Sequence, residues 1–119
     1  MRKLEGEQTL MRIFIGESDR YERQPLYEAL LEVFRREGFA GATVLKGAAG
    51  FGASSIVHSD KLLRFSSDLP VVVEVVDSRE KIEAVLPRLD DMLEGGLVTL
   101  EKAHVIRYVK SGKEAPSDV

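Results

Sequence analysis

The segment "PVVVEVVDSREKIEAVLPRLDDMLEGG", residues 70–96, decides the fold because it contains a strand that is followed at once by a helix. Its opening "PVVVEVVD" is apolar at nearly every position, which is typical of a strand that is central or buried on both faces. Asp77 and Glu80 have the spacing of a capping box, so we expect the helix to begin there. Pro87 predicts a kink, because a proline inside a helix costs about 3 kcal/mol, and Gly95-Gly96 predicts the end of the helix.

The chain repeats this alternation on both sides of the segment. "TLMRIFIGE", residues 9–17, has the period of a strand, and "PLYEALLEVFRREG", residues 25–38, has an apolar face at three- and four-residue spacing. Further strands are expected in "AGATVLKG", residues 40–47, and in "LVTLEKAHVIRYV", residues 97–109, the latter with an interruption near Glu101. This order is that of the α+β ferredoxin-like fold, βαββαβ, so we predict an antiparallel four-stranded sheet with both helices on one face.

Length and composition indicate one ordinary globular domain. The 119 residues are 44% hydrophobic and 31% charged, and we expect a flexible lead-in over 1–9, the domain over 10–110 and a flexible tail over 111–119. A formal net charge of −3 gives no basic surplus, so we expect no nucleic-acid partner. No apolar run approaches the roughly 18–20 residues of a membrane span, so no direct membrane insertion is expected. The lack of cysteine fits a cytoplasmic location.

A long connection, "GAAGFGASSIVHSDKLLRFSSDLP" from Gly47 to Pro70, separates the second and third strands. Gly47, Gly50 and Gly52 leave room for backbone amides to approach a phosphate, or they are hinges where the strand leaves the sheet. The stretch is not a Walker loop, because no Gly-Lys-Ser/Thr follows, and Ser55 replaces the third glycine of a dinucleotide fingerprint.

The remainder of that loop carries large apolar side chains, which a free flexible loop would lack. They are Ile56, Val57, Leu62, Leu63 and Phe65. Packing on the same protein or on a sister subunit is the first interpretation, and a docking surface for another protein is the alternative.

Few other residues have the pattern of a binding site. The amides after Gly95-Gly96 are suited to a phosphate, although such a pair is ordinarily a helix cap and a turn. Arg107 and Lys110 offer positive charge on the last strand, and Lys46 and Arg64 flank the long loop. The alternative for all four is solvated surface charge.

No pattern indicates a catalytic or metal site. His58 and His104 are far apart in the sequence and have no spaced carboxylate motif, so a metal ligand is not predicted. No nucleophile–base pair is recognisable, so no catalytic residue is predicted and we expect a protein that is not an enzyme.

Four motifs together resemble a known family: "RIFIGESDR", "GATVLKGAAGFG", "DLPVVVEVVD" and "GGLVTLEKAHVIRY". Over residues 10–108 they are similar, in order and spacing, to the PII-like (GlnB-like) proteins grouped as domain of unknown function 190. The resemblance implies a homotrimer with its sheets facing inward and a "T-loop" between the second and third strands, here residues 48–69. It also implies adenine-nucleotide binding in clefts between subunits, at the T-loop base, the turn after the second helix and the C-terminal segment.

The resemblance also implies the candidate binding residues and the partners. The residues are Lys46, Gly47, Gly50, Phe51, Gly52, Gly95, Gly96, Thr99 and Arg107. An adenine nucleotide is the expected ligand, and the expected client is a protein of unknown identity, with a membrane transporter or channel as one candidate class. Two features depart from PII proteins. Tyr21, Tyr27 and Tyr108 all lie outside the loop, so tyrosyl nucleotidylation is not expected, and the glycine–aspartate–glycine–lysine run after the second helix is reduced to Gly95-Gly96.

These inferences favour a trimeric, non-enzymatic regulator that senses a small ligand and signals through its T-loop. A CutA-like metal-binding trimer is the alternative, although the chain has two histidines and no cysteine for such a site. A small enzyme on the same fold is the third hypothesis. Metal retention after dialysis would favour the second hypothesis, and turnover of a nucleotide would favour the third.

Overall fold

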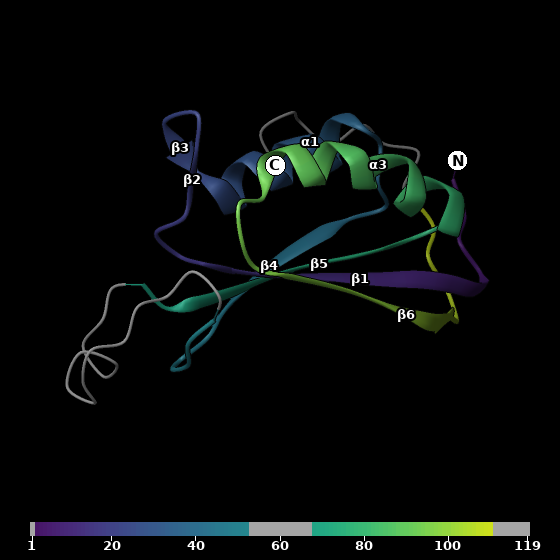
Figure 1. The fold of residues 1–119 in the computed structure, drawn as a ribbon. Coiled ribbons are helices and arrows are strands. Elements are labelled where there is room, and N and C mark those ends of the chain that lie inside the picture. Colours follow the sequence, from purple (N-terminus) through teal and green to yellow (C-terminus); the bar gives the residue numbers. More distant parts are fainter. Residues whose placement is uncertain (1, 53–67, 111–119) are drawn as a thin grey trace.

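The computed structural model describes residues 2–52 and 68–110, in which two helices cover one face of a four-stranded sheet (Figure 1). The elements follow the chain as β1 (Gly6–Gly16), β2 (Arg20–Tyr21), β3 (Gln24–Pro25), α1 (Leu26–Arg36), β4 (Ala42–Lys46), β5 (Pro70–Asp77), α3 (Arg79–Met92) and β6 (Leu97–Val105). Neighbouring strands of the sheet are antiparallel, in the order β4-β5-β1-β6. The expected ferredoxin-like fold is therefore confirmed.

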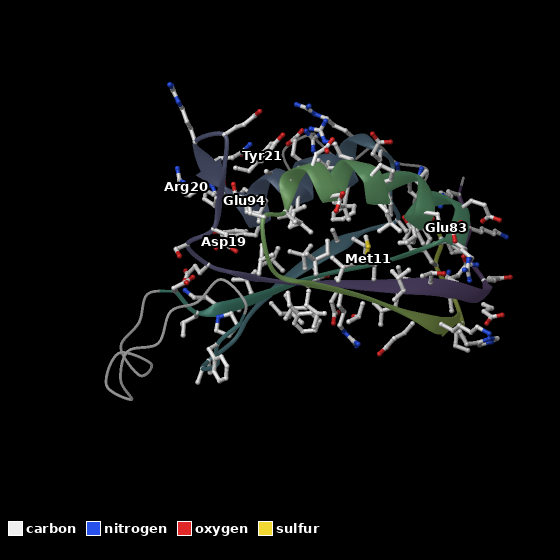
Figure 2. All side chains as sticks on the ribbon, in the orientation of Figure 1. Met11, Asp19, Arg20, Tyr21, Glu83 and Glu94 are labelled. Atoms are coloured by element: carbon white, nitrogen blue, oxygen red, sulfur yellow. The ribbon has the colours of Figure 1, made fainter. Side chains whose placement is uncertain are left out.

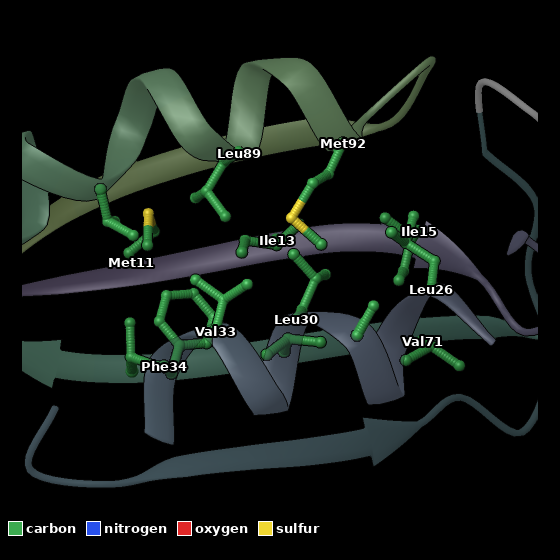
Figure 3. Close-up of a cluster of buried hydrophobic side chains, with 14 of the residues drawn as sticks. Met11, Ile13, Ile15, Leu26, Leu30, Val33, Phe34, Val71, Leu89 and Met92 are labelled. Atoms are coloured by element: carbon green, nitrogen blue, oxygen red, sulfur yellow. The ribbon is translucent and has the colours of Figure 1, made fainter. Parts of the chain in front are cut away.

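β1 is the strand around which the core is built, since it pairs with β5 on one side and with β6 on the other. Successive side chains of a strand point to opposite faces. Met11, Ile13 and Ile15 therefore face the helices, and Figure 3 shows them among side chains of α1 and α3. The buried partners are Val71, Val73 and Val75 of β5, Leu26, Ala29, Leu30, Val33 and Phe34 of α1, and Ile82, Val85, Leu89 and Met92 of α3. One apolar layer thus joins the sheet to both helices.

Local signals explain where α1 begins and ends. Pro25 precedes the first helical residue with a φ of −58°, and its ring fixes a value suited to a helix start. At the other end Gly38 has a φ of +74°, and the Phe39 amide donates to the Phe34 carbonyl at 3.0 Å. A glycine in the left-handed region is the usual cap of a helix C-terminus, and Gly38 has this role at the end of α1.

The predicted capping box of α3 is wrong. The N-cap is Ser78, whose hydroxyl accepts a hydrogen bond from the Lys81 amide at 3.2 Å. Asp77 is instead fully buried at the end of β5, where its carboxylate accepts hydrogen bonds from Arg2 and from the Ala40 and Ser78 amides. The helix runs without a break through Pro87, whose side chain is on the exposed side of α3.

Two boundaries near the N-terminus differ from the sequence analysis. β1 begins at Gly6, because its ladder with β6 continues as far as the pair of Gly6 with Val105. Residues 6–9 are therefore strand, where a flexible lead-in was expected. The polar turn before α1 contains the short β2–β3 hairpin, whose tip residues Glu22 and Arg23 have φ values of +47° and +72°.

The central position expected for β5 is confirmed, and its alternation of buried and half-buried residues shows that it is covered on one face only. One strand differs from expectation. β6 is continuous and lacks the predicted interruption near Glu101, because each of its residues from 97 to 105 has a partner on β1. The apolar loop residues Ile56, Val57, Leu62, Leu63 and Phe65, with His58, Arg64 and the predicted tail over 111–119, lie outside the described residues.

The two ends of the described chain lie side by side, and we call residues 2–5 and 108–110 the terminal strap. Lys3 forms an antiparallel bridge with Val109. The Leu4 amide donates to the Tyr108 carbonyl at 3.1 Å, and the Lys110 amide donates to the Arg2 carbonyl at 3.0 Å. Leu4 is buried, so the strap is packed against the domain.

Asp77 predicts a specific sensitivity to acid. Burial alone would raise the pKa of this carboxyl, but hydrogen bonds from Arg2, Ser78 and Ala40 outweigh burial and lower the pKa below its ordinary value of 3.8. The charged carboxylate therefore stabilises the fold above that pH, and the stabilisation is lost as the pH falls through the lowered pKa. We expect Asp77→Asn to lower the free energy of unfolding by about 2–4 kcal/mol at neutral pH. Urea unfolding at several pH values should show this difference shrink below about pH 4; a difference independent of pH would contradict it.

Candidate functional site

Four segments meet at one end of the sheet, which we call the loop-base edge. They are the end of β1 at Gly16, the end of β4 at Lys46, the start of β5 at Pro70 and the start of β6 at Leu97. The register fixes this arrangement, because Gly16 pairs with Pro70 and Phe14 pairs with Leu97. The 48–69 connection therefore leaves from and returns to this edge, beside the turn that follows α3 (Figure 1).

Backbone hydrogen bonds close the base of the long loop. The Gly47 amide donates to the Pro70 carbonyl at 2.7 Å, which joins the outgoing and returning sides just beyond the sheet. The returning side is also held by the turn after β1. There the Glu17 amide donates to the Leu69 carbonyl at 2.8 Å, and the Ser18 amide donates to Asp68 Oδ1 at 3.0 Å. Residues 68–70 are therefore fixed by both β4 and β1.

Close packing surrounds three glycines of this edge and is least adjustable at Gly47 and Gly96, where the neighbouring atoms are a proline ring and a backbone carbonyl. A Cβ on Gly16 would lie 2.6 Å from Asp68 Oδ1, and a Cβ on Gly47 would lie 2.8 Å from Pro70 Cγ. Gly96 has a φ of +104°, and its Cβ would lie 2.6 Å from the Phe14 carbonyl oxygen. These contacts favour the hinge and turn interpretations of Gly47 and Gly96. The amide of Gly47 is also bonded to Pro70, so it cannot hold a phosphate in this arrangement.

Acidic side chains are prominent at the loop-base edge. Glu17 Oε2 lies 2.7 Å from Lys46 Nζ in an ion pair. Asp19 Oδ2 accepts a hydrogen bond from the Gly16 amide at 3.0 Å, and Asp68 accepts the bond from Ser18 described above. A phosphate that approached this edge would therefore compete with Glu17 for Lys46.

The structure brings together only part of the predicted set. Lys46, Gly47, Gly95 and Gly96 lie at the loop-base edge, and Gly50, Phe51 and Gly52 follow on the outgoing side of the loop. Phe51 is 74% exposed. Thr99 pairs with Arg12 and lies on the edge strand β6, two residues after Leu97 at the loop-base edge. Arg107 follows β6 at the opposite end of the sheet, so within one subunit it is remote from the other candidates.

The sequence analysis missed the turn after β1 and the returning side of the loop. Glu17, Ser18 and Asp68 all contribute to the loop base. A topological signal was available, because in a βαββαβ chain the first and second strands end at the same edge of the sheet. The contact of Ser18 with Asp68 joins residues 50 positions apart, and no local sequence pattern predicts it.

A hollow of about 440 Å³ lies toward the other end of β4 and β5, and we call it the apolar hollow. It is lined by Leu4, Ala40, Gly41, Ala42, Thr43, Glu74, Val75, Val76, Val105 and Tyr108. Most of this lining is carbon, and Thr43, Glu74 and Tyr108 add a few polar groups. This volume and lining are typical of a small-molecule site. The sequence analysis missed the hollow, because Leu4 and Tyr108 reach it only through the terminal strap.

The sheet face opposite the helices, here called the open face, is partly apolar. Phe14 of β1 and Val72 of β5 point toward it, and Leu97 of β6 is 57% exposed there. Figure 2 shows a row of side chains that project from this face, away from Met11 and the helices. No described helix covers it.

An ion-pair network lies at the centre of the open face. Arg12 Nε is 2.8 Å from Glu74 Oε2, and Arg12 Nη1 is 3.2 Å from Glu101 Oε1. The hydrogen bond that Arg12 donates to Glu74, supported by the charges of both carboxylates, holds the pKa of Arg12 above its ordinary value. The three side chains tie β5, β1 and β6 together across the sheet.

The sequence and the fold together place the chain in a protein family. The sequence profile of DUF190, described as "Uncharacterized ACR", matches residues 8–105. The chain therefore belongs to this family, as its motifs predicted.

Two relatives show the same membership. A UPF0166 protein of Methanocaldococcus jannaschii is 35% identical over 99 residues, which cover 82% of this chain and 91% of the relative. A UPF0166 protein of Aquifex aeolicus is 41% identical over 97 residues, with the same coverage of 82% and 91%.

Solved structures of PII-like proteins share the fold. A PII-like signalling protein from Thermus thermophilus has a TM-score of 0.58 at 20% identity, and the match covers 89% of this chain and 94% of that one. The CPII protein of Thiomonas intermedia, in a complex with ADP, AMP and acetate, has a TM-score of 0.53 at 13% identity, with coverage of 92% and 94%. The chain thus has the PII-like fold.

Two kinds of feature are absent from the described residues. Neither α1 nor α3 is long and apolar enough to cross a membrane. Within residues 2–52 and 68–110, no group of three or more His, Cys, Asp or Glu side chains is arranged to hold a metal ion.

Gly96→Ala tests the packing of the turn between α3 and β6. The substitution places a Cβ against the Phe14 carbonyl and forces an alanine into the left-handed region, so we expect it to lower the free energy of unfolding by about 1–3 kcal/mol. Gly52→Ala is the matched control, because no atom lies within 4 Å of its added Cβ. Urea unfolding of the two variants measures the effect; equal stabilities would show that the turn does not constrain β6.

Proposed function

We propose that this protein is a trimeric, non-enzymatic PII-like regulator that binds an adenine nucleotide and signals to a protein client through its 48–69 loop. The observation that carries the proposal is the placement of the apolar hollow and the loop-base edge along one pair of strands, β4 and β5. A ligand that fills the hollow and reaches the edge would touch the base of the loop.

The uncovered surfaces of the sheet support a trimer. The open face is partly apolar, and both edge strands carry exposed large apolar side chains, with Leu45 of β4 49% exposed and Leu97 and Leu100 exposed on β6. Because the two edges differ, contact of the β4 edge of one copy with the β6 edge of the next would be head-to-tail, and such contacts form a closed ring where the rotation between copies returns to the first copy. A ring of three copies would cover the open face and create clefts between subunits.

The dimensions along β4 support a nucleotide. Ala42 and Thr43 line the hollow, and Lys46 lies at the loop-base edge. At about 3.3 Å per residue, Ala42 and Lys46 are about 13 Å apart, a span that suits a base, a ribose and phosphates in sequence. The aromatic base would occupy the hollow, where carbon surface and a few polar groups surround it. The ADP and AMP present in the complex of the Thiomonas protein are consistent with this ligand class.

The charges at the loop-base edge suggest how a phosphate would act on the loop. Lys46 is held by Glu17, and the turn that contains Glu17 also holds residues 68–70. A phosphate that takes Lys46 from Glu17 would weaken the tie between β4 and this turn. A ligand can shift a conformational equilibrium only through its different affinities for the two states, and this exchange of partners supplies such a difference. The client, with a membrane transporter or channel as one candidate class, would read the resulting loop arrangement.

Isothermal titration calorimetry with ADP tests the proposal. We expect the wild type to bind, Lys46→Ala to bind about tenfold more weakly, a loss of about 1.4 kcal/mol, and Glu17→Gln to bind more tightly because the phosphate no longer competes with a carboxylate. Limited proteolysis within residues 48–69 should change in rate when ADP is added.

Arg79→Ala is the control for loss of a surface charge. Arg79 is also an exposed basic residue in an ion pair, with Glu83 at 2.9 Å, but it lies on α3, away from the loop-base edge and from both edge strands. The affinity of this variant for ADP should equal that of the wild type. No heat of binding and no change in proteolysis with ADP, in the wild type, would refute the proposed function.

A further inference from the structure

We propose that Arg2 and Asp77 are positioning residues for the apolar hollow. Their ion pair, which we call the latch, holds the terminal strap in place, and this strap forms one wall of the hollow. The inference rests on the proposed function in that the hollow is taken as the seat of the adenine base. It adds a role for the N-terminal segment, which lies before the residues matched by the family profile.

The latch is a charged contact at a buried carboxylate. Arg2 Nη1 lies 3.0 Å from Asp77 Oδ2, and Arg2 Nη2 bonds to Asp77 Oδ1. The Asp77 side chain is 0% exposed, while that of Arg2 is 33% exposed, so the guanidinium closes over the carboxylate from the surface. Arg2 Nη1 also lies 3.3 Å from the Gly38 carbonyl oxygen. The strap is thereby tied to both the end of β5 and the turn after α1.

The carboxylate is committed to this contact rather than to helix capping. Ser78 caps α3, as described above, so Asp77 is not needed for that task. Besides Arg2, Asp77 accepts hydrogen bonds from the Ala40 amide at 2.8 Å and from the Ser78 amide at 2.7 Å. These bonds hold the carboxylate in one place and charged. Charge-assisted, bidentate pairs of this kind are stronger and more directional than neutral hydrogen bonds.

The strap connects the latch to the hollow over a short path. Two residues after Arg2, the Leu4 side chain is buried and lines the hollow, and Tyr108 lines it from the other half of the strap. The Leu4 amide bonds to the Tyr108 carbonyl, so the two lining residues are held to each other as well. Displacement of Arg2 would therefore loosen both.

The strap alone would be weakly held. Its two halves share the Leu4–Tyr108 and Lys110–Arg2 backbone bonds and the Lys3–Val109 bridge. A pair of short strands is marginal in water unless it packs against other elements. The buried Leu4 side chain supplies apolar packing, and the ion pair adds a charged, directional contact between the strap and the end of β5.

Hydrogen–deuterium exchange of the full chain tests the latch without any ligand. In Arg2→Ala we expect the Leu4 and Lys110 amides to exchange at least tenfold faster than in the wild type, while the Ile13 and Val73 amides of the core keep their rates. Arg2→Lys should give an intermediate rate, because lysine keeps the charge but not the two-pronged geometry. Lys3→Ala is the matched control, since Lys3 is exposed and adjacent to Arg2.

Titration with ADP tests the coupling to the hollow. Arg2→Ala should raise the Kd for ADP at least tenfold, and ADP should slow exchange of the Leu4 amide in the wild type, because coupling between two equilibria is reciprocal. A residue that only stabilised the fold would not give that ligand-dependent protection.

The outcomes separate the two proposals. Unchanged Leu4 and Lys110 exchange in Arg2→Ala would overturn the latch. Faster exchange with an unchanged Kd for ADP would overturn the positioning role. A wild type that binds no ADP would remove the proposed function and with it the positioning role, and the exchange rates would then decide the latch by themselves.

Discussion

The structure depends on the one-sided coverage of a sheet whose central strand, β1, is paired on both sides. The helices α1 and α3 bury the face that carries Met11, Ile13 and Ile15, and the alternation of side chains along a strand leaves Phe14 and Arg12 on the other face. That open face combines apolar side chains with the network of Arg12, Glu74 and Glu101. The helices cover only one face of the sheet. The open face therefore presents apolar side chains that favour association with another protein surface.

The topology also decides where function can lie. The ends of β1 and β4 and the starts of β5 and β6 share one edge, so the topology brings the long connection, the turn after β1 and the turn after α3 together, and hydrogen bonds from Glu17 and Ser18 fix the returning side of the connection. Toward the other end of β4 and β5, the terminal strap completes the apolar hollow. A ligand along these two strands would therefore contact both the terminal strap and the loop-base edge. The strap is fixed by Asp77, and the loop-base edge is fixed by the ion pair of Lys46 with Glu17.

Much of the fold could be predicted from the sequence, because strand and helix periods are local properties. The apolar face at three- and four-residue spacing over residues 25–38 predicted α1, and the valines of residues 70–77 predicted a central strand. The signal at Asp77 was misread, since an Asp-x-x-Glu spacing fits a capping box while the side chain in fact faces inward to meet Arg2. The start of β1 was also missed, because the polar residues 6–9 become strand only through their pairing with β6.

The candidate site was less predictable from the sequence, because its contacts join residues that are far apart in the chain. Glycine and charge patterns in the sequence indicated Lys46, Gly47 and Gly96. Their contacts in the structure are with Glu17, Pro70 and Phe14 respectively, which are distant in the sequence. The hollow combines the first residues of the chain with Tyr108 and with β5, a combination that no spacing rule contains.

The most direct test of the central claim is the mass of the wild-type protein in solution, measured by sedimentation equilibrium at micromolar concentration. If the open face and the two unlike edges join copies head-to-tail, the mass will be three times that of the single chain. A mass equal to that of one chain would contradict the trimer and, with it, the clefts between subunits in which the ligand is placed.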